Sequence, residues 1–109
     1  SNVKKGMQIS HEELFGPAIG ITKTSNIEEA INLANDTRFG LSASVFTEDI
    51  NKAMRFANEV DSGNLHINFG TAWRAENMPY GGLKNSGIGK EGPKYAINEM
   101  TETKMVIIH

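Results

Sequence analysis

The fold is decided by residues 25–67, which read SNIEEAINLANDTRFGLSASVFTEDINKAMRFANEVDSGNLHI. Apolar residues recur at helical spacing twice in this stretch, first at Ile27, Ala30, Ile31 and Ala34, and then at Ile50, Ala53, Met54, Ala57 and Val60. Each set falls on one face of a helix, because residues three and four apart are neighbours on a helical surface. The stretch therefore predicts two amphipathic helices, each with one buried face.

The ends of both helices carry recognisable signals. Ser25 and Glu28 match the capping box that begins a helix, in which each side chain accepts a backbone amide proton of the other residue. Either Thr47 or Asp49 is expected to cap the second helix. Gly63 is expected to stop it, since glycine adopts the left-handed conformation at no steric cost.

Short apolar segments with strand character lie on either side of these helices. We expect strands at residues 18–24 and 42–46, and a third that contains Leu65 and Ile67. Strands joined through helices are normally parallel, with right-handed crossovers. The predicted order is βαβαβ, which indicates part of an open α/β sheet.

The second half of the chain has a different character. Residues 68–92 are rich in Gly, Asn, Pro and charge, and a loop of this length usually serves a function. A short helix is expected from Pro93 to about Met100, because proline is tolerated in the first turn. Residues 104–108 read KMVII and predict a terminal strand that is apolar on both faces.

Composition excludes several classes of protein. The 109 residues are 39% hydrophobic and 22% charged with a net charge of −2, which argues against disorder and against nucleic acid or an anionic membrane as a partner. Cysteine is absent, which excludes disulfides, zinc-thiolate sites and a cysteine nucleophile within these residues. No apolar run approaches the length of a membrane span, and no secretory signal is expected, so we expect a cytoplasmic protein.

Two patterns point weakly to ligands. Residues 87–92 read GIGKEG and fit the dinucleotide fingerprint G-x-G-x-x-G, but no strand leads into them, so a tight turn is the favoured interpretation. His11, His66 and His109 are far apart and predict no metal site, and His66 is expected on a partly polar strand face.

The residues alone do not assign a function to the charged side chains. Glu12 and Glu13 are expected to be a solvated charge pair. Trp73 and Arg74 either bind an anion, for which arginine supplies a fork of donors, or form a surface stack of the two side chains. The residues alone therefore indicate an incomplete α/β module with a functional Gly-rich loop.

Several motifs together resemble a known family. They are EELFGP at 12–17, EEAI at 28–31, LANDT at 33–37, FGLSASVFT at 39–47, MPYGGLK at 78–84, SGIGKEG at 86–92 and TETK at 101–104. Their order resembles the C-terminal end of NAD(P)-dependent aldehyde dehydrogenases, in the branch that oxidises lactaldehyde or, without phosphorylation, glyceraldehyde 3-phosphate. The resemblance assigns residues 1–72 to the C-terminal half of the catalytic domain. It assigns residues 73–109 to a substrate loop, a Gly-rich turn, a helix and an oligomerisation strand.

The family's chemistry sets the expected activity. A cysteine thiolate adds to the aldehyde, a hydride passes to NAD or NADP, and water hydrolyses the thioester to the acid. The resemblance places that cysteine, the general-base glutamate and the cofactor domain upstream of these residues. The 109-residue chain is therefore expected to be inactive alone.

The resemblance also implies roles for five residues. Glu13 would hold the nicotinamide ribose hydroxyls, and Phe15 would pack beside the nicotinamide. Tyr80 would line the substrate tunnel, and Arg74 would bind an anionic group on the aldehyde, although a shift of one residue puts Trp73 there instead. Glu91 would relay protons, or would be a surface charge at a helix start.

Residues 104–108 resemble the strand through which the family's subunits associate as dimers or tetramers. We therefore expect a homo-oligomer. Two other interpretations remain open: a non-catalytic self-assembling α/β module, and a free-standing nucleotide-binding domain that uses the Gly-rich loop.

Overall fold

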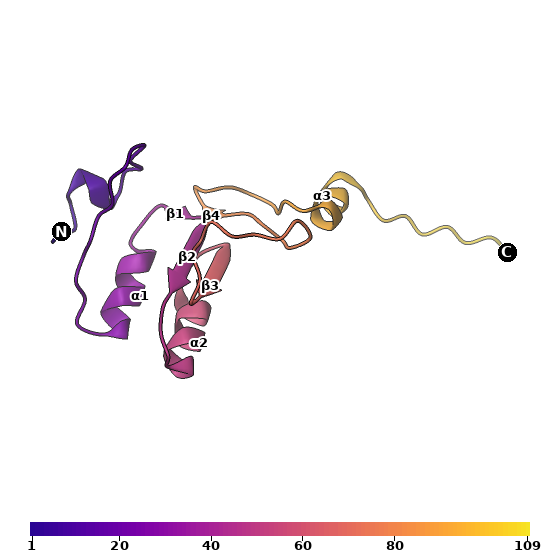
Figure 1. Cartoon of the computed structure of the whole chain (residues 1–109). Coiled ribbons are helices and arrows are strands. Elements are labelled where there is room, and N and C mark those ends of the chain that lie inside the picture. The colour runs from indigo at the N-terminus through magenta and orange to yellow at the C-terminus, as the bar shows by residue number, and fades with distance from the viewer.

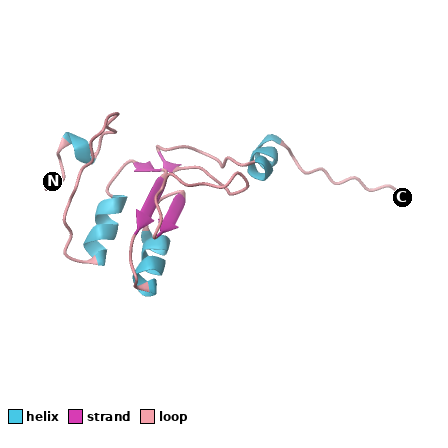
Figure 2. Cartoon of the chain, in the orientation of Figure 1, coloured by secondary structure: helices cyan, strands magenta, loops and turns pink.

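The computed structural model describes all residues 1–109. In chain order it contains a 3-10 helix at Gln8–Ser10, then α1 (Ile27–Asn35), β1 (Phe39–Gly40), β2 (Ser42–Val45), α2 (Ile50–Glu59), β3 (Asn64–Ile67), β4 (Leu83–Lys84) and α3 (Pro93–Met100) (Figures 1 and 2). This mixture of helices and strands agrees with the predicted α/β class, and α3 has the predicted bounds. No helix is both long enough and apolar enough to cross a bilayer.

The centre of the structure is one β-α-β unit. Strands β2 and β3 pair in parallel, with Ser42 opposite Asn64 and Val45 opposite Ile67, and α2 connects them. Its buried core is small and consists of Ile31 from α1 with Phe56 and Val60 from the α2 region, against which Ile27, Ala43, Val45 and Leu65 pack. The two helices are thus confirmed, but the buried face of α2 is only partly as predicted. Ala53 and Val60 are buried, whereas Ile50 and Met54 are 67% and 48% exposed. Phe56, which was not predicted for this face, is buried in their place.

Helices α1 and α2 each begin at a side-chain cap. In α1 the cap lies one residue later than predicted: Asn26 Oδ1 accepts from the Glu29 amide at 2.8 Å, and Glu29 Oε2 accepts from the Ser25 amide at 2.7 Å. Ser25 and Asn26 are both good cap residues, so residue type alone does not decide which of them begins the helix. Asp49 caps α2, where its carboxylate accepts hydrogen bonds from the amides of Asn51 and Lys52.

The prediction for Gly63 is wrong. Helix α2 ends at Glu59, before Gly63 is reached, and Gly63 does not have a left-handed backbone. A Cβ atom at Gly63 would instead overlap the carbonyl oxygen of Gly81. Glycine is needed there because β3 begins directly beneath the chain that leads into β4.

The predicted strand at residues 18–24 is also wrong, so the order βαβαβ is reduced to one β-α-β unit. Two hydrogen bonds to Val3 hold this segment, from the Val3 amide to Ile21 O at 3.0 Å and from the Thr22 hydroxyl to Val3 O at 2.9 Å, and no ladder forms. The structure adds a ladder that the sequence did not predict, in which β1 pairs antiparallel with β4. Both strands have only two residues, too few to show a periodic pattern.

The second half of the chain extends away from this unit. Figure 1 shows α3 and the yellow C-terminal tail projecting to one side, and the molecule measures 69 × 32 × 21 Å. Residues 104–108 have no strand partner in the chain, so they form no strand here, and their apolar side chains are exposed.

The accessible surface is large for this mass. It measures 8703 Å², whereas a compact monomer of this mass exposes about 5,900 Å². Only eight of the 109 residues are buried. Much apolar surface is therefore uncovered in the chain by itself.

Candidate functional site

The loop that carries Arg74 starts from a fixed point. Asn68 follows β3 with a left-handed backbone, φ 56°. Its side-chain oxygen accepts from the Thr47 amide at 2.8 Å, and its side-chain nitrogen donates to Thr47 O at 2.9 Å. This double contact joins the carboxyl ends of β2 and β3, the edge of a parallel sheet at which ligands usually bind.

Aromatic side chains continue the loop. The Trp73 ring meets His66 edge-on at 6.5 Å and Phe69 edge-on at 6.3 Å. His66 lies in β3 and shares its strand face with Asn64, so this face is polar as expected. Both side chains are buried, and His66 is 9% exposed because the loop folds back over this strand position. The predicted alternative of an Arg74 stack on Trp73 is wrong, since Arg74 stacks on Tyr80.

Three of the predicted site residues meet in this loop. The Arg74 guanidinium lies over the Tyr80 ring, 4.8 Å from its centroid, and its Nη1 donates to Glu91 Oε2 at 3.0 Å. Tyr80 and Glu91 face each other across an antiparallel bridge with amide-to-carbonyl distances of 3.2 and 2.6 Å. The backbone thus holds the aromatic ring and the carboxylate as one platform beneath the guanidinium.

The charges of this cluster face solvent. The Arg74 side chain is 42% exposed and that of Glu91 is 68% exposed. An exposed ion pair contributes about 0.2–1 kcal/mol, and an exposed cation–π contact about 0.5–1 kcal/mol. Arg74 makes no hydrogen bond other than the one to Glu91, so most of its five N–H donors remain open to a ligand.

The Gly-rich segment forms a turn beside this cluster. Gly87, Gly89 and Gly92 all have positive φ values. The expectation that no strand precedes the segment is wrong, because β4 ends at Lys84, three residues before Gly87. This two-residue strand pairs antiparallel with β1, however, and is not the parallel strand of a dinucleotide-binding unit. Lys90 Nζ donates to the carbonyl of Gly81 at 3.0 Å, so its charge is used within the turn. These contacts favour the turn interpretation over a phosphate-binding fingerprint.

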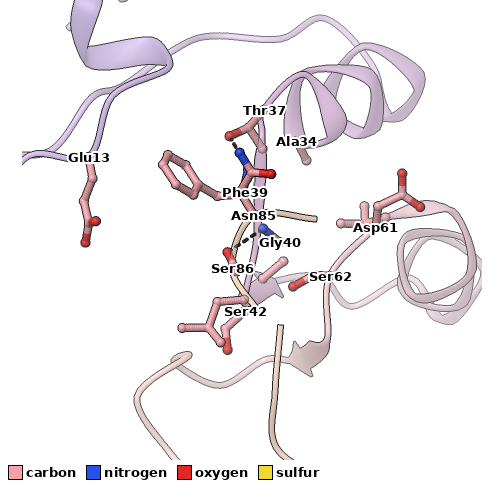
Figure 3. Close-up of a pocket in the computed structure, with 13 residues that line it drawn as sticks. Glu13, Ala34, Thr37, Phe39, Gly40, Ser42, Asp61, Ser62, Asn85 and Ser86 are labelled. Atoms are coloured by element: carbon pink, nitrogen blue, oxygen red, sulfur yellow. Dashed lines mark hydrogen bonds between the residues drawn. The ribbon is translucent and has the colours of Figure 1, made fainter. Parts of the chain in front are cut away.

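Glu13 lies in a different region, at a cavity of about 570 Å³ between the N-terminal segment and β1. Figure 3 shows Glu13 and the ring of Phe39 on one side of this cavity and Asp61 on the other. The amide of Gly40 donates to Ser86 Oγ at 2.9 Å in the middle. Its lining mixes hydrophobic residues with polar side chains, which include Thr37, Ser42, Ser62, Asn85 and Ser86.

The two predicted cofactor residues, Glu13 and Phe15, have different surroundings, and Glu13 also differs from its neighbour Glu12. Glu12 accepts a hydrogen bond from Gln8 Nε2 at 2.7 Å, whereas the Glu13 carboxylate has no partner in the chain. Phe15 is 94% exposed and so takes no part in core packing. Figure 1 shows the N-terminal segment and the orange loop on opposite sides of the α1–α2 unit, so these residues are not brought to the Arg74 cluster.

The shifted pKa values belong to a structural ion pair outside both regions. Arg55 of α2 donates to Glu59 Oε1 at 2.7 Å and also to the carboxylate of Glu28 in α1. Its hydrogen bond holds the pKa of Glu28 below the ordinary value, and the two carboxylates raise the pKa of Arg55. This network fastens α1 to α2 and has no ligand-binding geometry.

Sequence reasoning missed the role of Asn68, the close approach of Gly63 to Gly81 and the ion pair of Arg74 with Glu91. Asparagine adopts the left-handed conformation more readily than most residues, so an asparagine directly after a strand could have been identified from the sequence. The contact of Gly63 with Gly81 and that of Arg74 with Glu91 join residues 17 or 18 positions apart. Patterns among neighbouring residues do not predict contacts between residues that lie so far apart in the sequence.

Comparison with known proteins gives consistent matches along the chain. A model of the aldehyde dehydrogenase family matches residues 1–106. The lactaldehyde dehydrogenase of Methanococcus vannielii is 49% identical over 108 residues, which are 99% of this chain and 23% of that protein. The 3-sulfolactaldehyde dehydrogenase of Priestia aryabhattai is 46% identical over 109 residues, which are 100% of this chain and 23% of that protein.

A solved structure gives the same result. The glyceraldehyde-3-phosphate dehydrogenase GapN of Methanocaldococcus jannaschii, crystallised with NADP, superposes with a TM-score of 0.73 and 48% identity over 77% of this chain and 18% of that chain. The chain therefore spans less than a quarter of the length of these relatives.

Proposed function

The chain belongs to the aldehyde dehydrogenase family, and from this premise we propose that it is the C-terminal segment of an enzyme that oxidises an aldehyde to its carboxylic acid. NAD or NADP, when bound, accepts the hydride in that reaction. The nucleophilic cysteine, the general base and most of the cofactor site come from the remainder of the parent. The isolated chain, which has no thiol, is inactive on this proposal.

The observation that carries the proposal is the convergence of Arg74, Tyr80 and Glu91. Arg74 offers a fork of open donors, which matches a carboxylate, sulfonate or phosphate better than a neutral group. One relative is named for 3-sulfolactaldehyde, whose sulfonate is such an anion. We therefore assign the anionic end of an aldehyde such as glyceraldehyde 3-phosphate or 3-sulfolactaldehyde to Arg74, and a wall of the substrate tunnel to Tyr80. Lactaldehyde, the other candidate substrate, is neutral and would not need this arginine.

The cofactor roles of Glu13 and Phe15 rest on the chemistry of their surroundings. A carboxylate without a partner suits a ribose diol, because it accepts two hydrogen bonds at once. The exposed ring of Phe15 has its faces available for a nicotinamide. Both residues lie in the N-terminal segment, which would face the cofactor domain of the parent.

Glu91 is assigned to proton relay. Its carboxylate is solvent-exposed and adjacent to the substrate residues, so it connects the site with bulk water. This role requires the carboxylate to be free of Arg74 for part of the cycle.

A chimera tests these assignments. In it, the chain replaces the matching 108 residues of the Methanococcus vannielii lactaldehyde dehydrogenase. Loss of a charged hydrogen bond costs about 1.5–3 kcal/mol, so Arg74→Ala should raise KM for an anionic aldehyde by about tenfold or more. KM for a neutral aldehyde of similar size should change little.

Arg38→Ala is the matched control, since Arg38 also lies over an aromatic ring, that of Phe39, at 5.0 Å and outside the substrate loop. Equal effects of Arg74→Ala on both aldehydes would refute the anion-binding role. For the cofactor role, Glu13→Gln should raise the KM for NAD or NADP and slow turnover, and unchanged values of both would refute it.

The proposal extends to association of subunits through residues 104–108. These residues are exposed, apolar on both faces and without a strand partner in the chain. An unpaired apolar edge favours pairing with another chain. Sedimentation equilibrium at micromolar concentration should therefore give a mass above 11.9 kDa, and a concentration-independent monomer would refute this part.

A further inference from the structure

The Arg74–Glu91 contact has a consequence for substrate binding. The proposed function gives the guanidinium of Arg74 to an anion on the substrate, yet in the structure Glu91 already occupies one of its nitrogens at 3.0 Å. A second anion brought to the same guanidinium would lie beside that carboxylate and be repelled by it.

We propose that Glu91 is a built-in competitor for Arg74, which an anionic substrate displaces from the guanidinium. The inference rests on the proposed anion-binding role of Arg74. It adds a role for Glu91 in setting the affinity of the site, because its carboxylate weakens the binding of every anion at Arg74.

The geometry allows the exchange without movement of the backbone. Glu91 is held through its amide and carbonyl, which bridge to Tyr80, so its side chain is free to turn away. The Tyr80 ring remains beneath the guanidinium at 4.8 Å and keeps it in place while the carboxylate leaves. Because both charged side chains are exposed, the pair is weak enough for millimolar anions to compete.

No other group in the chain is placed to do the same. Arg74 has no second acidic partner, and Lys90, the cation next to Glu91 in sequence, donates to the carbonyl of Gly81. Displacement therefore leaves the Glu91 carboxylate without a cation in this chain. An anion on Arg74 thus releases Glu91 for the proton relay assigned to it above.

The test uses the 109-residue chain, inorganic phosphate as the probe and the fluorescence of Trp73, the one tryptophan, which adjoins Arg74. Phosphate is titrated at constant ionic strength kept with chloride. Glu91→Gln removes the competing charge, and the backbone bridge to Tyr80 does not depend on this side chain. Glu76→Gln is the matched control, because it removes a carboxylate two residues from Arg74 that has no partner in the structure. Circular dichroism verifies that each variant is folded, and Glu91→Ser serves as a second variant.

The loss of an exposed ion pair predicts that Glu91→Gln binds phosphate about two- to fivefold tighter than the unchanged chain. Arg74→Gln should abolish the response, and Glu76→Gln should leave the affinity unchanged. Equal or weaker binding by Glu91→Gln, an equal gain in Glu76→Gln, or no phosphate response in any variant would overturn the inference.

This titration requires no cofactor, cysteine or turnover. An inactive chimera would therefore refute the proposed function without changing the binding result. Conversely, a charge-dependent KM effect of Arg74→Ala with no effect of Glu91→Gln on phosphate affinity would refute only the competition.

Discussion

Substitution of Gly63 by alanine tests the packing that holds the substrate loop against the sheet. A Cβ atom at this position would overlap the carbonyl oxygen of Gly81 and would lie 2.8 Å from its carbonyl carbon and 3.0 Å from Gly82 Cα. All three obstacles are backbone atoms, so no side-chain rotation relieves the clash. The chain at Gly81 and Gly82 must move as a unit.

That movement also strains two hydrogen bonds. The Gly81 carbonyl accepts from Lys90 Nζ at 3.0 Å and from Asn64 Nδ2 at 3.3 Å. Overpacking costs about 1–3 kcal/mol, and each lost hydrogen bond about 0.5–1.5 kcal/mol. The smaller conformational freedom of alanine in the unfolded chain returns about 0.4–1 kcal/mol. If both hydrogen bonds are lost, the free energy of unfolding should therefore fall by about 1–5 kcal/mol.

The assay is urea unfolding followed by circular dichroism at one fixed chain concentration. Gly70→Ala is the matched control, because a Cβ atom there meets nothing within 4 Å and the backbone is not left-handed. It should be neutral or stabilising by up to about 1 kcal/mol. If the two substitutions changed the free energy of unfolding by the same amount within about 0.5 kcal/mol, the close approach of Gly63 and Gly81 would be refuted.

Substitutions at three further positions test other contacts by the same unfolding assay. Asn68→Ala should destabilise the chain by about 1–3 kcal/mol, since it loses the two hydrogen bonds to Thr47 and strains the left-handed backbone. Asn68→Gly should destabilise the chain less, because glycine adopts this backbone without strain. A larger loss of stability in Asn68→Gly than in Asn68→Ala would contradict this reasoning. Lys84→Met removes an ammonium that donates to the carbonyls of Asn35 and Thr37 at 3.0 and 3.3 Å, and should cost about 1 kcal/mol; no change would show that the end of α1 needs no such donor. The low pKa of Glu28 means that its pairing with Arg55 stabilises the fold above the ordinary glutamate pKa of about 4.3 and is lost as pH falls through the lowered folded-state value. The destabilisation by Arg55→Gln should therefore shrink on acidification, and a difference that is constant with pH would refute this coupling.

Local patterns in the sequence were sufficient for the helices. The apolar spacing and caps predicted α1 and α2, because helices are specified by residues three and four apart, and Pro93 predicted the start of α3. The capping box was placed one residue early, since Ser25 and Asn26 are both good caps and only the backbone decides between them.

Strands were predicted less well because they depend on a partner. Residues 18–24 have the residue pattern of a strand but pair with no other strand in this chain. The two-residue strands β1 and β4 are too short to show such a pattern, yet they pair with each other. Residues 104–108 likewise have no partner here, so their predicted pairing concerns another chain or another part of the parent.

The candidate site was predicted by residue and not by contact. The motifs selected Arg74, Tyr80 and Glu91 separately, and the structure joins them through a guanidinium over a ring and an ion pair. Such contacts arise from a loop that returns on itself, and only its three-dimensional course reveals them. The assignments of Glu13 and Phe15 remain predictions.

The central claim is that this chain completes an aldehyde-oxidising enzyme and does not act alone. The most direct test measures lactaldehyde-dependent formation of NADH or NADPH by the isolated chain and by the chimera with the Methanococcus vannielii enzyme, which is 49% identical over this region. The account predicts product from the chimera and none from the isolated chain. Activity of the isolated chain, or a chimera that assembles like the parent enzyme yet forms no reduced cofactor, would contradict it.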